Sequence, residues 1–110
     1  MLLVTGGIDS DDHWQDKTDV FDYTIPHAGI WRTAGRLPSP RYGLRAAMVG
    51  DLLHVTGGYD PDSGDMDEIL AWDSVSETWS VAGHMETGRE NHGVTEVDLA
   101  VVADYCSANI

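Results

Sequence analysis

Short apolar stretches alternate with polar, turn-forming stretches along the whole chain, and no helical periodicity is sustained. In the second half, four stretches rich in β-branched and aromatic residues are bounded by Gly, Pro, Asp and Ser. They predict strands at 44–49, 52–56, 68–73 and 78–82. The Gly50-Asp51 step between the first two fits a tight hairpin, because such residues tolerate positive φ. The pattern therefore predicts an all-β fold.

The pattern also repeats. The stretch at 2–7, which ends in a glycine pair, recurs at 52–58 with the glycines 51 residues further on. Residues 19–23 match residues 68–72 at a spacing of 49, and Trp31 matches Trp79 at a spacing of 48. The same spacing of 48 relates three further pairs outside the strands: Gly35 and Gly83, Leu37 and Met85, Arg41 and Arg89. These matches indicate two copies of one structural unit.

Each unit has a glycine pair after an apolar strand, an aromatic residue about fifteen positions later, and a Trp about eight positions after that. This arrangement resembles the kelch motif, and it is carried by Gly6, Gly7, Tyr23, Trp31, Gly57, Gly58, Trp72 and Trp79. Arg41 and Arg89 are similar to the basic residue that often opens the next kelch repeat. The resemblance implies a partial β-propeller of about two four-stranded antiparallel kelch blades.

The spacing suggests how the chain divides. Residues 1–43 are expected to form a first repeat that lacks its first strand, and residues 44–90 a second repeat. Residues 91–110 either begin a degenerate third repeat or leave the domain. The apolar run at 99–103 reads as a strand, but Tyr105 and Cys106 stand where a third glycine pair is expected.

The residues of the motif are expected to have structural roles in the blades. Glycine allows backbone conformations and close approaches that are closed to other residues, and the large aromatic side chains fill the wedge between blades. Two blades cannot close a ring of four to eight, so open blade edges would permit self-association. We expect the chain to be a fragment; the alternatives are an oligomer that completes the ring and an incomplete gene model.

Composition narrows the class of partner. The chain has 110 residues, with 19 acidic and 6 basic residues and a formal net charge of -13, which argues against nucleic acid. Such an acidic excess also serves solubility alone. There is no apolar run long enough for a membrane helix and no signal-peptide pattern at the N-terminus. A single Cys and the lack of a glycosylation sequon favour an intracellular location.

No cofactor, metal or catalytic site is predicted. The acidic loop after the second glycine pair does not fit an EF-hand calcium loop, because Gly64 falls where the third ligand should be. The five histidines, His13, His27, His54, His84 and His92, lack zinc-ligand spacing. A copper site like that of galactose oxidase, which has kelch-like repeats, needs ligands from several blades. No Ser lies in a Gly-x-Ser-x-Gly elbow, so we expect no enzyme activity.

The resemblance favours a protein-protein interaction module, part of an adaptor or scaffold, since loops of kelch proteins commonly contact partner proteins. The alternatives are a purely structural pair of blades in a larger propeller and a fragment of a galactose-oxidase-like enzyme. The expected contact regions are loops 8–18 and 59–67 and the segment 36–45, with the candidate residues Asp11, Asp12, Trp14, Arg36, Arg41, Asp60, Asp62 and Asp65. Trp14 is either an exposed hot spot or a loop anchor against the blade.

Overall fold

The computed structural model describes residues 1–24 and 29–97, and within these ranges every regular element is a strand. The expectations for His27, for a strand at 99–103 and for Tyr105 and Cys106 lie outside the described residues. Within the described ranges, no helix is long and apolar enough to cross a membrane.

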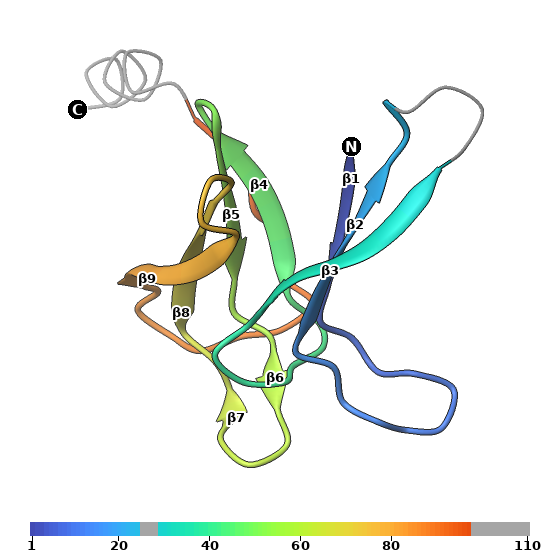
Figure 1. Ribbon diagram of the computed structural model, residues 1–110. Coiled ribbons are helices and arrows are strands. Elements are labelled where there is room, and N and C mark those ends of the chain that lie inside the picture. Colours follow the sequence, from blue (N-terminus) through green and yellow to red (C-terminus); the bar gives the residue numbers. More distant parts are fainter. Residues whose placement is uncertain (25–28, 98–110) are drawn as a thin grey trace.

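Two antiparallel sheets lie beside each other and form successive blades (Figure 1). Blade 1 has the order β1-β2-β3, built from β1 (Leu2–Thr5), β2 (Lys17–Asp22) and β3 (Ile30–Arg36). Blade 2 has the order β4-β5-β8-β9, built from β4 (Arg45–Val49), β5 (Leu52–Thr56), β8 (Glu68–Asp73) and β9 (Thr78–His84). A short ribbon of β6 (Tyr59–Asp60) and β7 (Gly64–Asp65) extends from blade 2.

The predicted all-β fold is confirmed, and blade 2 follows the predicted strands closely. β5 and β8 have the predicted bounds, β4 begins one residue later, and β9 continues to His84. The predicted hairpin joins β4 to β5. Gly50 has φ 60°, whereas Asp51 is not among the residues with positive φ, which is the pattern of a type II′ turn.

The strand register corrects one match between the repeats. Trp72 pairs with Trp79 across β8 and β9, and the residue that pairs with Trp31 across β2 and β3 is Phe21. Phe21, not Tyr23, is therefore the equivalent of Trp72, at the same spacing of 51 as the glycine pairs. The spacing between equivalent residues of the two repeats falls from 51 at Phe21 to 48 at Trp31. It falls because the β2–β3 connection has three residues more than the β8–β9 connection.

The glycine pairs have the structural role that the sequence predicts, and their backbone contacts are the same in both blades. The Gly7 N–H donates to the Arg41 carbonyl at 2.7 Å, and the Gly58 N–H donates to the Arg89 carbonyl at 3.0 Å. Gly6 has φ 71°, and a Cβ there would lie 2.8 Å from the Arg41 carbonyl oxygen. Only glycine satisfies both the positive φ and this close approach.

The apolar core consists of residues of blade 2 and of the connection that joins the two blades. Leu37, from the segment that follows β3, is buried with Val55 and Leu70 of blade 2, and Leu44 and Trp79 pack against them. Trp72 and Trp79 thus lie at the blade interface, as the packing interpretation requires. Trp31 differs: it stacks on Phe21 with a centroid distance of 4.9 Å but is 55% exposed, because no described residue covers that face of blade 1.

Candidate protein-interaction surface

Three segments converge at one end of the two blades: the loop 6–16, the connection 37–44 and the β6–β7 ribbon (Figure 1). We call this end the loop surface. The Arg41 N–H donates to the Gln15 carbonyl at 3.2 Å, which ties the connection to the first loop. Tyr42 and Tyr59 exchange two backbone hydrogen bonds of 3.1 and 2.7 Å, which tie the connection to the ribbon. Backbone contacts therefore fix the three segments relative to one another.

An aromatic cluster lies where these segments meet. The Trp14 ring packs against the Tyr42 ring at a centroid distance of 4.9 Å and against the Tyr59 ring at 5.8 Å. The two tyrosine rings lie 5.7 Å apart. Each distance falls in the range of favourable aromatic pairs. One residue from each segment thus contributes to a single cluster.

Trp14 is half-buried rather than exposed. Its packing on both tyrosines corresponds to the loop-anchor alternative, and its backbone pairs with Ile8 across the loop. Loops of this kind are often mobile, and an aromatic anchor reduces the conformational entropy that a partner must remove on binding.

Arg41 does not lie on the accessible surface. Its side chain is 1% exposed, and Nη2 donates to the Glu68 carboxylate at 2.8 Å and to the Ser39 hydroxyl at 3.0 Å. Sequence alone does not reveal this burial, because Arg is rarely buried unless it is paired. Arg41 is a packing and pairing residue of the junction between the blades.

Asp60 is also buried, with 5% of its surface exposed. Its Oδ1 accepts the Asp62 N–H at 2.8 Å, which closes a local turn in the ribbon. That backbone hydrogen bond, together with the Ser39 hydroxyl, holds the pKa of the Asp60 carboxyl below its ordinary value. Asp60 therefore stays ionised and shapes the turn.

The remaining candidates are exposed. Asp11 and Asp12 lie at the tip of the first loop, and Asp62 and Asp65 lie on the ribbon. Arg36 is exposed and pairs with Asp16. The loop surface thus presents four free carboxylates around an aromatic centre.

Tyr42 and Tyr59 belong to this surface but were not among the predicted site residues. A signal was present, because each position holds a different residue in the other repeat: Glu90 at the equivalent of Tyr42 and Ile8 at the equivalent of Tyr59. The pKa of the Tyr42 phenol is raised, first by burial and then by the charge of Glu90. Burial and the neighbouring charge both disfavour the ionised phenolate.

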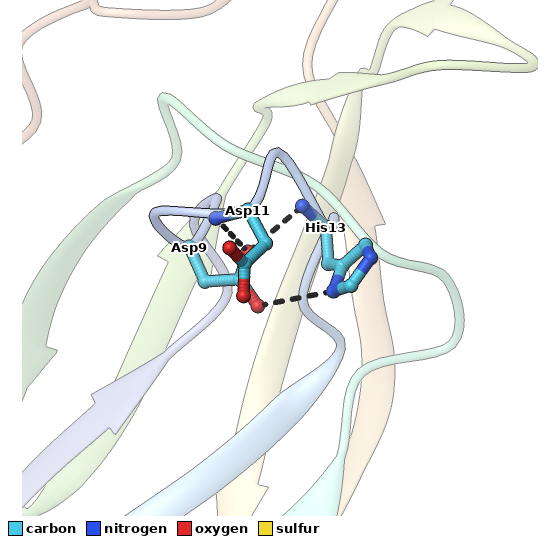
Figure 2. Close-up of side chains that lie close together, drawn as sticks. All are labelled: Asp9, Asp11 and His13. Atoms are coloured by element: carbon cyan, nitrogen blue, oxygen red, sulfur yellow. Dashed lines mark hydrogen bonds and ion pairs between the residues drawn. The ribbon is translucent and has the colours of Figure 1, made fainter.

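Asp9, Asp11 and His13 offer ligand atoms within 4.8 Å of one another in the first loop (Figure 2). Their proximity follows from the turn itself: Asp9 Oδ1 accepts the N–H groups of Asp11 and His13, each at 2.9 Å. The bond from His13 lowers the pKa of Asp9 most. The alternating Asp-x-Asp-x-His spacing could have predicted this proximity. The Asp9 carboxylate accepts two backbone N–H groups, so the turn accounts for the proximity of these exposed side chains without a metal.

Curated proteins of the kelch class are similar to this chain. Kelch-like protein 25 from Homo sapiens is 37% identical over 73 residues, which cover 64% of this chain and 12% of that protein. Alpha-scruin from Limulus polyphemus is 30% identical over 102 residues, or 86% of this chain and 11% of that protein. Kelch-like ECH-associated protein 1A from Danio rerio is 24% identical over 106 residues, which cover 94% of this chain and 17% of that protein. The chain therefore spans less than a fifth of the length of each.

No protein-family model matches the chain. The similarities nevertheless agree with the structure, in which the paired glycines and the Trp72–Trp79 pair occupy equivalent places in successive antiparallel blades. The chain belongs to the kelch-repeat proteins, and its two sheets are blades of a kelch-type β-propeller.

Proposed function

We propose that this pair of blades is a protein-interaction module whose contact region is the loop surface. The observation that carries the proposal is the joining of three separate segments by the cluster of Trp14, Tyr42 and Tyr59. A surface held in one conformation loses little entropy on binding, so it can recognise a partner with modest contact area. If these blades are part of a larger adaptor or scaffold protein, that protein would bind its partner through the same surface.

The charge of the surface suggests the chemistry of the partner. Asp11, Asp12, Asp62 and Asp65 are exposed there, and the chain as a whole carries a net charge of -13. Such a surface attracts basic protein surfaces, speeds their association and becomes less effective as salt is added. We propose binding of another protein, and not catalysis, as the activity of these residues.

A pair of matched variants tests the proposal. Asp62→Asn with Asp65→Asn removes two charges from the loop surface, and Asp51→Asn with Glu96→Gln removes two exposed charges near the β4–β5 hairpin, at the opposite end. Proteins captured by the chain from an extract are purified and their affinities for each variant measured. Exposed charges contribute about 0.2–1 kcal/mol each, so the loop variant should bind between about twofold and about thirtyfold more weakly.

The hairpin variant should bind its partner as the unaltered chain does. If every captured protein binds the two variants equally well, the loop surface is not the contact region. Capture alone does not support the proposal, because uncovered blade faces also retain proteins nonspecifically.

A further inference from the structure

Each blade has two different faces, and the contact between blade 1 and blade 2 shows what each face is for. Blade 2 presents Trp72 and Trp79 toward blade 1. Blade 1 receives them with Thr18, whose hydroxyl accepts the Trp79 indole N–H at 2.7 Å, and with Gly35, over which the Trp72 ring lies. We call the first the aromatic face and the second the receiving face.

The strand register shows that both faces exist on both blades, since residues paired across antiparallel strands share a face. On blade 1 the aromatic face contains the pairs Phe21–Trp31 and Leu2–Phe21. Trp31 is 55% exposed and Leu2 53% exposed, so this face is open in the described residues. On blade 2 the receiving face contains the pair Ile69–Gly83, which stands where blade 1 has Thr18–Gly35.

Within the described residues, the receiving face of blade 2 also has uncovered space. A hollow of about 350 Å³ on blade 2 has Leu52, Ala71 and Ser80 in its lining. The equivalent positions on blade 1, Met1, Val20 and Arg32, line a smaller hollow of about 240 Å³, and Trp72 and Glu77 of blade 2 line its other side. Among the described residues, the recess on blade 1 is thus bounded by a neighbouring blade, whereas the equivalent recess on blade 2 is not.

We infer that the open aromatic face of blade 1 packs against the open receiving face of blade 2 in a second copy of the chain. This repeats between copies the interface that already joins the blades within one copy. Phe21 would take the place of Trp72 over Gly83, where an added Cβ has Ile69 as its nearest neighbour, at 3.8 Å. The exposed ring of Tyr23 follows Phe21 at the position equivalent to Ser74, and it would enter the larger hollow.

The polar contacts of the internal interface have no counterpart between copies. Ile69 replaces Thr18, so the Trp31 indole finds no hydroxyl acceptor, and Ser80 replaces Arg32, which pairs with Glu77 in the internal interface. Contact between copies is therefore weaker than contact within a copy. Because each copy carries a net charge of -13, repulsion also opposes it, and added salt should favour it.

Contact between two different faces is heterologous, and such an interface forms closed rings or open filaments. Propellers close with four to eight blades, so rings of roughly two to four copies are expected. Sedimentation velocity on the 110-residue chain, over a wide range of protein concentration and at two salt concentrations, measures the assembly. We expect a discrete oligomer whose fraction rises with concentration and with salt.

Two variants make the test specific. Trp31→Ser removes the aromatic face, and Gly83→Leu fills the receiving face at a position with free space and no positive φ. Each should be monomeric, whereas an equimolar mixture should form a one-to-one dimer, because each variant keeps the face that the other lacks. Val75→Ser, at a 94% exposed side chain in the β8–β9 turn, is the control and should assemble as the unaltered chain does.

A third variant tests the missing hydrogen bond. Ile69→Thr supplies the hydroxyl that Trp31 lacks, so it should strengthen assembly by about fivefold or more, corresponding to the roughly 1 kcal/mol that a hydrogen bond contributes. Circular dichroism verifies that each variant is folded. A chain that stays monomeric under all conditions overturns the inference, and so does association that neither Trp31→Ser nor Gly83→Leu reduces.

Discussion

The indole Nε1 of Trp79 donates a hydrogen bond of 2.7 Å to the hydroxyl of Thr18, sixty-one positions earlier in the chain. Thr18 is fully buried, and its hydroxyl also lies 2.8 Å from that of Thr5. The contact therefore joins β9 of blade 2 to β2 and β1 of blade 1. It places a buried polar group within the packing between the two kelch repeats.

Replacing Thr18 by Val should destabilise the chain by about 1–3 kcal/mol, because the partly buried Trp79 N–H would lose its acceptor. Chemical denaturation followed by Trp fluorescence measures the loss. Thr18→Ser keeps the hydroxyl and should cost less. Equal denaturation midpoints for Thr18→Val and the unaltered chain would show that this hydrogen bond does not stabilise the blade pair.

Gly57→Ala should cost more stability than Gly7→Ala. Both glycines have positive φ, at 62° and 95°, so both substitutions carry backbone strain of about 1–2 kcal/mol. Only at Gly57 would the new Cβ also collide with a backbone carbonyl, that of Arg89; at Gly7 no atom lies within 4 Å. Thermal denaturation of the two variants side by side measures the difference, and the reverse order would contradict the packing described for the glycine pairs.

Arg41→Ala should destabilise the chain by about 3–5 kcal/mol, because it leaves the partly buried Glu68 carboxylate without its partner. Arg36→Ala removes an ion pair to Asp16 whose arginine side chain is 61% exposed, and should cost less than about 1 kcal/mol. Urea denaturation of both variants measures the contrast. Similar costs would mean that the Arg41–Glu68 pair contributes no more than a surface pair.

Stability should fall as the pH is lowered through the ordinary pKa of histidine, 6.5, because of His92. Burial, then the charges of Arg45 and Arg89, lower the pKa of His92 in the folded chain. The unfolded chain therefore binds the proton first, and protonation below pH 6.5 favours unfolding. Within the described residues, His92 Nδ1 is buried without a hydrogen-bond partner, while Nε2 lies 2.6 Å from the Thr56 hydroxyl.

Comparison of the two repeats suggests which substitution to use for this test. Leu44 occupies in the first repeat the position of His92, so His92→Leu should remove this part of the pH dependence. His84→Gln, at an exposed side chain that contacts Asp67, is the control and should retain it. Urea denaturation on both sides of pH 6.5 compares the variants. An unchanged pH profile for His92→Leu would exclude His92 as the source.

Much of the fold could be predicted because blade packing depends on residue types that the sequence displays directly. Positive φ requires glycine, and the interface requires large aromatic side chains, so the glycine pairs and Trp72 and Trp79 could be recognised. The match of Tyr23 to Trp72 failed, because a longer loop after β2 shifts the spacing and only strand pairing reveals that Phe21 opposes Trp31.

The loop surface was less predictable. Its location followed from the position of loops in such folds, but the burial of Arg41 and Asp60 depends on contacts between segments distant in sequence. The same holds for the cluster of Trp14, Tyr42 and Tyr59, whose members come from three different segments. Spacing within one repeat carries no information about contacts of this kind.

Hydrogen exchange of the indole N–H groups tests most directly whether the two repeats form one packed pair of blades. At low protein concentration, NMR should show slow exchange for Trp79, which is bonded to Thr18, and fast exchange for Trp31, which is 55% exposed. Thr18→Val should make the Trp79 indole exchange faster. Rapid exchange of the Trp79 indole in the unaltered chain would mean that the blades do not pack together, and would contradict the account.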